Sequence, residues 1–194
     1  MARELQTRSD EALARQSQEG DFAAFEELVS RYEARIYAFV FHSCGHETDA
    51  REATQDTFVR AFEAITRYDA NRPFAPWLFT IARRRTIDCL RTRVPVVEQA
   101  TPEETDLETP ADCLARREEA EDLWRVARSC LPDGQFKALW LRYAEDMDIA
   151  QIAGVLDKTQ THVKVLLFRA RHTLAEKLDD PIAPPTPAMK GAAP

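Results

Sequence analysis

The chain has 194 residues, of which 44% are hydrophobic and 30% charged, so it can bury a core and is not a wholly disordered protein. A formal net charge of −7 argues against a protein that binds nucleic acid, although the distribution of the charge matters more than its total. No apolar run approaches the length of a membrane span, and the polar first residues predict no secretory signal peptide. We therefore expect a cytoplasmic protein without membrane insertion.

The negative charge is concentrated in the middle of the chain. Residues 1–93 carry 14 basic and 15 acidic side chains, residues 94–130 carry 4 and 10, and residues 131–194 carry 8 and 8. Within the middle, residues 94–111 are rich in prolines and carboxylates and have no aromatic residue. This composition predicts a flexible acidic linker between two folded parts whose own charges nearly balance.

The chain has only five glycines, and its apolar residues recur at a spacing of three and four positions. Both features predict an all-α fold. The first helix is expected over residues 21–37, with Asp21 as its N-cap and Gly45 as the stop signal after it. A second helix is expected over residues 49–65. Residues 66–76 hold two prolines and several turn formers, which predict a loop.

Residues 76–93, PWLFTIARRRTIDCLRTR, predict a third helix that joins an apolar side to three consecutive arginines. Arg84, Asp88 and Arg91 fall on one flank, where the carboxylate can bridge both guanidiniums. Arg83 points away from that flank. The basic surface is either a solvated face balanced by acidic neighbours or a contact for a polyanion.

The C-terminal part predicts one helix over residues 112–130 and three more over residues 131–178. The last two form a helix-turn-helix, in which the turn DKTQ precedes a longer basic helix. A helix in the major groove reads bases with its N-terminal turns. The candidates for contacts with bases or nearby phosphates are Thr159, Gln160, Thr161, His162 and Lys164. The alternative is a helical hairpin used only for protein contacts.

Two further features indicate little chemistry. His42, Cys44 and His46 alternate in HSCGHE, but structural zinc sites pair their ligands and need a fourth, so we expect no metal. The four scattered cysteines predict reduced thiols. No nucleophile–base pair or glycine-rich phosphate loop is recognisable, so we expect neither an enzyme nor a cofactor. A metal-dependent enzyme built on the histidine and cysteine cluster is the alternative.

Three segments together resemble one family: DAREATQDTFVRAF, FAPWLFTIARRRTIDCLR and LPDGQFKALWLRYAEDMDIAQIAGVL followed by THVKVLLFRARHTL. They are similar to bacterial RNA polymerase sigma factors of the sigma-70 family, in the extracytoplasmic-function (ECF) subfamily. The resemblance implies two small helical domains joined by the acidic linker. The expected parts are an N-terminal extension (1–20), a sigma-2-like domain (21–93), the linker (94–111), a sigma-4-like helix-turn-helix domain (112–178) and a proline-rich disordered tail (179–194).

The resemblance also implies roles for individual residues. The core polymerase-binding residues would be Asp49, Glu52, Gln55 and Asp56, for which a solvated acidic face is the alternative. The residues that bind the −10 element would be Tyr68, Asp69, Asn71, Arg72, Arg83, Arg84 and Arg91, since a polar loop with an aromatic residue beside a basic helix suits displaced single-stranded DNA. Those that bind the −35 element would be Thr159, Gln160, Thr161, His162, Lys164, Arg169 and Arg171.

The implied partners are core RNA polymerase, through its beta and beta-prime subunits, promoter DNA, and an anti-sigma factor that could hold the protein at the membrane. Val165, Leu166 and Phe168 replace residues that are mostly polar in the family, which puts the −35 readout in doubt at Leu166 and leaves Phe168 for a partner. The linker would thread the polymerase interior or act as a simple tether. Two rival functions remain: a sigma mimic that titrates an anti-sigma factor, and a helix-turn-helix repressor that works without polymerase.

Overall fold

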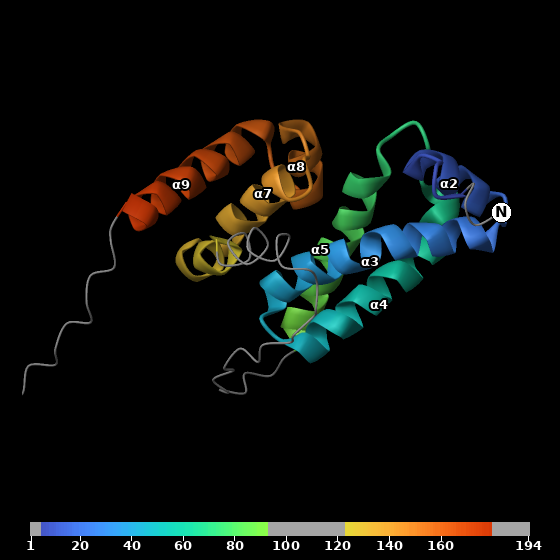
Figure 1. The fold of residues 1–194 in the computed structure, drawn as a ribbon, viewed down its shortest axis with the longest axis horizontal. Helices are drawn as coiled ribbons and strands as arrows, with labels where there is room; N and C mark the ends of the chain where they lie inside the picture. The colour runs from blue at the N-terminus through green and yellow to red at the C-terminus, as the bar shows by residue number, and fades with distance from the viewer. Residues whose placement is uncertain (1–4, 93–122, 180–194) are drawn as a thin grey trace, which may run out of the picture.

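The computed structural model describes residues 5–92 and 123–179, which contain helices and no strand (Figure 1). This confirms the all-α prediction. None of the described helices is long and apolar enough to cross a membrane. The predicted linker, residues 112–122 of the helix after it, and residues 180–194 of the tail lie outside the described residues.

Residues 5–92 form what we call the N-terminal bundle. Its elements are α2 (Asp10–Gln18), α3 (Phe22–Cys44), α4 (Glu47–Ala64), the 3-10 turn η1 (Ile65–Arg67) and α5 (Phe74–Thr92). Asp21 caps α3, because its side chain accepts hydrogen bonds from the N–H groups of Ala23 and Ala24 at 3.0 and 3.3 Å. Gly45 ends the helix with a φ of 74°, a conformation that favours glycine. Both signals were predicted, although α3 is longer than the expected 21–37.

The third predicted helix starts earlier than its proline content suggests. α5 begins at Phe74, so Pro76 is its third residue and not part of the loop. Proline is tolerated there because the first N–H groups of a helix have no partner within it. Phe39 of α3 and Phe79 of α5 are both fully buried, and their rings meet edge to face at 5.2 Å between centroids. The bundle core therefore forms where α3 and α5 face each other.

Helix α2 belongs to the bundle, although residues 1–20 were expected to be an extension of it. Leu13 and Ala14 of α2 are fully buried, and α2 packs against α3, η1 and α5. Ser9 caps the helix by accepting a hydrogen bond from the N–H of Ala12. The compact part of the chain thus begins before residue 21.

Residues 123–179 form what we call the C-terminal unit. Helical residues 123–130 precede α7 (Asp133–Tyr143), α8 (Ile149–Leu156) and α9 (Gln160–Asp179). Asp148 and Gln151 make a reciprocal cap at the start of α8, with both hydrogen bonds at 2.8 Å. Asp157 ends α8 in the left-handed region at φ 55°, and Val163 and Ala170 of α9 are fully buried. The predicted helix-turn-helix is therefore present.

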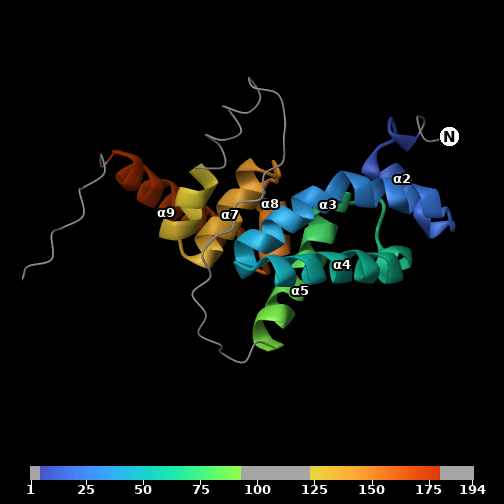
Figure 2. The same cartoon turned by 60° about the horizontal axis from the view of Figure 1, so that its bottom comes forward.

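The two units pack against each other. Helix α8 lies against α5, and α7 lies against α3 (Figures 1 and 2). Arg35 of α3 forms an ion pair with Glu145, just after α7, at 2.5 Å. Close by, the ring of His42 lies 4.9 Å from that of Trp140. The structure is thus a closed arrangement in which a polar and an aromatic contact join the bundle to the C-terminal unit.

Candidate polymerase and nucleic-acid interfaces

The predicted polymerase surface lies along one side of α4. Residues 49, 52 and 56 are spaced by three and four positions, so they share a helix face. Glu52 and Gln55 are exposed, and Asp49 lies in the acidic first turn of α4, where a negative charge is favourable. Asp56 is engaged by arginines on both sides, with Arg60 at 3.6 Å and Arg85 at 3.4 Å. The available polar groups of this face are therefore chiefly Glu52 and Gln55.

Tyr68 is not at the surface where a base-stacking residue is needed. It is only 5% exposed, and its ring packs against Phe74 and Trp77 with centroids at 5.5 and 5.0 Å. Burial raises the pKa of its phenol to about 12, so the hydroxyl stays protonated and donates a hydrogen bond to the carbonyl of Arg72. Tyr68 therefore shapes the loop from inside in this structure, and its role as a direct contact for the −10 element stays a prediction. Trp77 is likewise a packing residue.

The tip of the loop between η1 and α5 is polar and exposed. Asp69, Asn71 and Arg72 all face solvent. The Asp69 carboxylate accepts hydrogen bonds from the backbone and side-chain N–H groups of Asn71, both at 3.1 Å, and it lies 3.4 Å from Arg72. The backbone hydrogen bond from Asn71 is the main cause that lowers the pKa of Asp69. The loop thus presents an ionised carboxylate, an amide and a guanidinium on an ordered turn.

The arginines of α5 differ in their surroundings. Arg84 is exposed and Arg83 half-buried, and neither forms an ion pair within the described residues. Arg85 is the paired one, with Asp88 at 2.7 Å. The expected bridge from Asp88 to Arg84 is therefore replaced by the pair with Arg85, which lies one residue closer. The side chain of Arg91 lies outside the described residues.

Two basic residues that the sequence did not single out lie beside this helix. A hollow of about 300 Å³ between α4 and α5 is lined by Arg60, Arg67, Arg84 and Arg85, together with Glu63, Ala64 and Ile81. Arg60 is neutralised in part by Glu63 at 3.0 Å. Arg67 lies at the end of η1 and is exposed. The hollow is therefore a positively charged concavity that suits a phosphate group. The sequence signal for it was weak: Arg60 lies in the last two turns of α4, and Arg67 is the last residue of η1.

The predicted −35 residues gather at the start of α9. Thr159, Gln160, Thr161, His162 and Lys164 are all exposed. The hydroxyl of Thr159 accepts a hydrogen bond from the N–H of His162 at 3.2 Å, so it acts as an N-cap. The surface formed at this end is polar, solvent-facing and carried by the second helix of the motif, as a major-groove contact requires.

Further along α9, basic and apolar residues share the surface. Arg169 and Arg171 are exposed, whereas Leu166 is half-buried and lies near Gly134 of α7. Leu166 is therefore a packing residue within the unit. Phe168 is 64% exposed, a large apolar group facing solvent.

His42 has a structural role that its neighbours in the sequence did not reveal. Its ring packs against Phe136 and Trp140 with centroids at 5.5 and 4.9 Å. Burial, aided by the nearby Arg128, lowers the pKa of His42 to about 4. No group of three potential metal ligands occurs among the residues that the structure describes. His42 is thus a neutral aromatic contact between the two units.

Comparison with known proteins gives a consistent result. The family model for sigma-70 region 2 matches residues 28–94, and that for sigma-70 region 4 matches residues 125–174. The chain is 32% identical over 185 residues to the RNA polymerase sigma factor CnrH of Cupriavidus metallidurans, covering 88% of this chain and 95% of that protein. It is 28% identical over 178 residues to the ECF RNA polymerase sigma factor SigW of Bacillus subtilis, covering 86% and 95%.

Solved structures agree with the sequence matches. The structure of CnrH in complex with the cytosolic domain of CnrY superposes with a TM-score of 0.66 at 28% identity, and the match covers 90% of this chain and all of that one. A second, the sigma factor RpoE bound to the anti-sigma factor NepR from Bartonella quintana, has a TM-score of 0.63 at 18% identity, covers 81% of this chain and 98% of that one, and supports the fold. The chain belongs to the sigma-70 family of RNA polymerase sigma factors, in its ECF subfamily.

Proposed function

We propose that this protein is an alternative sigma factor that binds core RNA polymerase in the cytoplasm, directs it to promoters and helps to separate the DNA strands at the −10 element. The observation that carries this proposal is the grouping of surfaces on one bundle. The polar face of α4 lies next to the basic hollow between α4 and α5. The protein would act by binding alone, without a reaction of its own.

The role of α4 would be to hold the polymerase. Glu52 and Gln55 are exposed on a helix that packs firmly on α3 and α5, so they offer donors and acceptors on a rigid support. Polar groups at a protein interface fix its register and orientation. Asp56 would serve this face indirectly, because it is already paired with Arg60 and Arg85.

The role of the loop and of α5 would be to hold the displaced strand at the −10 element. Asp69 and Asn71 present hydrogen-bonding groups that can read the exposed edge of an unstacked base, which is where single strands are recognised. Arg84, with Arg67 beside it, would bind the phosphates that follow. Asp69 and Asn71 would thus supply sequence preference, and Arg84 and Arg67 would supply electrostatic affinity for the DNA backbone.

The C-terminal unit would bind the −35 element as duplex DNA. Gln160 and His162 are exposed in the first turn of α9 and would contact base edges, and Lys164, one turn after Gln160, would contact a phosphate. An acidic protein can bind promoter DNA in the holoenzyme because core polymerase would supply much of the free energy of binding. The net charge of −7 is therefore compatible with promoter binding in the complex.

Simultaneous binding of both elements would require the two units to separate. Elements 25 base pairs apart lie about 85 Å apart along duplex DNA at roughly 3.4 Å per step. Residues 93–122 connect the units, and thirty residues can span at most about 100 Å. The chain is therefore long enough to open, and the closed arrangement would be a form outside the promoter complex.

An anti-sigma factor is the further partner we propose. CnrH, to which the chain is similar along nearly its whole length, has been solved in complex with the cytosolic domain of CnrY. Phe168 and Val165, at 64% and 41% exposure, offer apolar contacts on α9 for such a protein. The same residues favour the rival function, a sigma mimic that only titrates an inhibitor.

Transcription reconstituted with purified core polymerase and a randomised promoter library decides between these functions. We expect the protein to select a set of initiating templates that core polymerase alone does not use. Binding to core polymerase without any initiation would favour the sigma mimic. Sequence-specific retardation of duplex DNA in the absence of core polymerase would favour the repressor.

A further inference from the structure

The loop that we assign to the −10 element is tied at its beginning to helix α2. The side-chain amide of Gln18, the last residue of α2, donates hydrogen bonds to the carbonyls of Ile65 and Tyr68 at 2.8 and 2.7 Å. These residues are 47 and 50 positions away in the sequence. A part of the chain that was expected to be an extension therefore contacts the backbone of the loop directly.

Both carbonyls lie where the chain leaves helical geometry. η1 ends at Arg67, and Tyr68 is extended, with φ −70° and ψ 133°. The carbonyl of Ile65 also accepts a hydrogen bond from the N–H of Tyr68 at 3.1 Å, whereas the carbonyl of Tyr68 lies beyond the turn, and a buried carbonyl without a partner is costly. A primary amide has two N–H donors, so Gln18 gives the Tyr68 carbonyl a partner, adds a second one to Ile65, and fixes the direction in which the loop departs.

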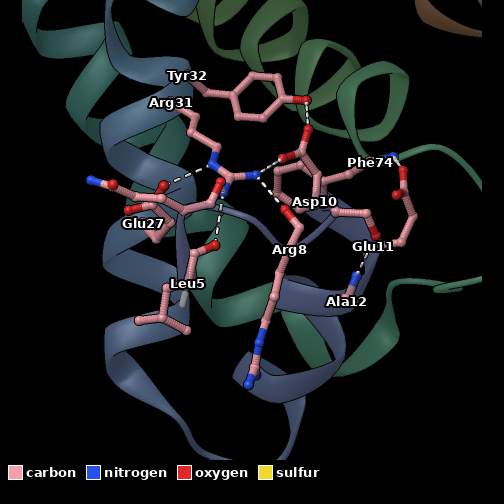
Figure 3. Close-up of polar contacts among 11 residues, drawn as sticks. Leu5, Arg8, Asp10, Glu11, Ala12, Glu27, Arg31, Tyr32 and Phe74 are labelled. Carbon is pink, nitrogen blue, oxygen red and sulfur yellow. Dashed lines mark hydrogen bonds and ion pairs between the residues drawn. The ribbon is translucent and has the colours of Figure 1, made fainter. Parts of the chain in front are cut away.

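The far end of the loop is tied to the same helix. A carboxylate oxygen of Glu11 accepts a hydrogen bond from the backbone N–H of Phe74, the first residue of α5, at 3.2 Å (Figure 3). Between the two attachments, the Tyr68 hydroxyl donates to the carbonyl of Arg72. Residues 69–73 lie between these two attachments, and all of them except the half-buried Ala70 are exposed. Residues of α2 thus hold the loop at both ends.

Helix α2 is itself anchored firmly enough to act as a support. Asp10 accepts hydrogen bonds from Arg31 at 2.7 Å and from Tyr32 at 2.5 Å (Figure 3). The guanidinium of Arg31 also donates to Glu27 and to the carbonyls of Leu5, Gln6 and Arg8. Residues 5–10 are therefore fastened to α3 through Arg31 and Tyr32.

We propose that Gln18 and Glu11 are positioning residues that fix the loop in the conformation in which Asp69, Asn71 and Arg72 meet the displaced promoter strand. This inference rests on the proposed function, in which that loop contacts the −10 element. Holding the loop before binding avoids part of the ordering cost of binding. Loss of the attachments therefore weakens recognition of the −10 sequence more than it weakens non-specific DNA binding or attachment to polymerase.

Holoenzyme made from the full chain and core polymerase provides the test. The probes are two fluorescent single-stranded oligonucleotides: the non-template −10 sequence of a promoter selected by wild-type holoenzyme, and a scrambled version of it. Gln18→Met keeps the length of the side chain and removes its donors, whereas Gln18→Lys restores a donor group. Glu19→Ala, at the exposed end of the same helix, is the matched control.

We expect Gln18→Met to lower affinity for the selected strand about fivefold, as the loss of hydrogen bonds that hold the loop implies, with a smaller change for the scrambled strand. Gln18→Lys should recover part of the discrimination, and Glu19→Ala should match wild type. Affinity for core polymerase should be unchanged in all three. Unaltered discrimination in Gln18→Met, or an equal loss for both strands, would overturn the positioning role.

Glu11 provides an independent comparison if Gln18→Met does not fold. Glu11→Gln keeps an oxygen that can accept from the N–H of Phe74, whereas Glu11→Ala does not. Discrimination should fall in Glu11→Ala and persist in Glu11→Gln; equal behaviour of the two variants would contradict the inference. A wild-type protein that selects no promoter would instead overturn the proposed function, and this inference with it.

Discussion

Arg35 and Glu145, 110 residues apart, meet across the boundary between the two units. The Arg35 guanidinium donates to one carboxylate oxygen of Glu145 from Nη2 at 2.5 Å and from Nε at 3.0 Å. The side chain of Glu145 is only 2% exposed, whereas that of Arg35 is 40% exposed. Burial raises the pKa of Glu145, and Arg35 opposes that rise. The closed arrangement therefore buries a carboxylate whose main compensation comes from the other unit.

Replacing this arginine should open the molecule. In Arg35→Ala the carboxylate of Glu145 would remain buried without its cation, an arrangement that costs roughly 2–3 kcal/mol. Separation of the units removes that cost by returning the carboxylate to water. We expect a larger radius of gyration in small-angle X-ray scattering, with each unit still helical by circular dichroism.

Two variants serve as controls for this prediction. Arg51→Ala removes an exposed arginine paired with Glu47 of the same helix, at 2.5 Å, and should leave the radius unchanged. Glu145→Gln combined with Arg35→Ala removes the buried charge and should restore part of the closed form. A radius equal to that of wild type in Arg35→Ala would show that the pair does not hold the units together.

Acid should weaken the packing between the two units at His42, which lies against Phe136 and Trp140. The pKa of His42, about 4 in the folded protein, lies below the value of about 6.5 for an exposed histidine. Between those pH values the unfolded or opened state binds more protons, so stability is complete above about pH 6.5 and falls as the pH drops towards 4. Urea denaturation of wild type and His42→Phe at pH 5.0 and 7.5 measures this, and the variant should lose less stability on acidification. Parallel losses would contradict the assignment.

Gln55→Ala should weaken attachment to core polymerase. Gln55 is exposed on α4 and has no structural partner among the described residues, so its removal should not disturb the bundle. Polar interface residues of this kind typically contribute on the order of 1 kcal/mol, which corresponds to about a fivefold change in dissociation constant. Fluorescence anisotropy with labelled core polymerase measures it directly. Unchanged affinity would remove Gln55 from the polymerase surface.

Arg84→Ala should weaken binding to promoter DNA and leave binding to core polymerase unchanged. Removal of a phosphate contact lowers affinity for all promoters alike and reduces the slope of log affinity against log salt concentration by about one. Binding of the holoenzyme to promoter DNA at several salt concentrations provides the measurement, and core affinity should stay at the wild-type value. Lys177→Ala also removes an exposed positive charge, from the end of α9, and serves as the control. An unaltered salt slope in Arg84→Ala would count against a phosphate contact.

Gln160 and Lys164 should separate base readout from phosphate binding at the −35 element. Gln160→Ala should relax preference at a base pair, since a specific contact between side chain and base discriminates by about 1–3 kcal/mol. Lys164→Ala should reduce affinity evenly across sequences. Selection of −35 sequences by each holoenzyme from a randomised library distinguishes the two outcomes. Equal sequence profiles for Gln160→Ala and wild type would place that residue away from the bases.

Local signals made much of the fold predictable from the sequence. Asp21 at the start of α3 and Gly45 at its end act on the nearest backbone groups. Their effects can therefore be predicted from a few neighbouring residues of the sequence. The same holds for the helix-turn-helix, whose apolar spacing specified both helices. The family, recognised from three motifs in order, is confirmed by the matches over residues 28–94 and 125–174.

Contacts between distant segments were not predictable in this way. Helix α2 is short and mostly polar, and it is stabilised by partners such as Arg31 that lie far along the chain. Tyr68 in a polar loop has the same sequence signal whether it stacks on a base or packs against Trp77. The roles of His42 and Arg35 depend on a second unit whose position no local pattern specifies. The residue assignments for polymerase and DNA remain predictions.

The aromatic cluster around His42 also gives the protein a built-in optical signal. Trp124 and Trp140 lie 4.7 Å apart between ring centroids, and Trp140 is only 7% exposed while it rests against His42 of the bundle. Trp77, the third tryptophan, lies within the bundle beside Phe74. Departure of the bundle would bring water to Trp140 and shift its emission to longer wavelength while Trp77 stays unaffected. Intrinsic fluorescence could therefore follow the parting of the two units in real time, without any label.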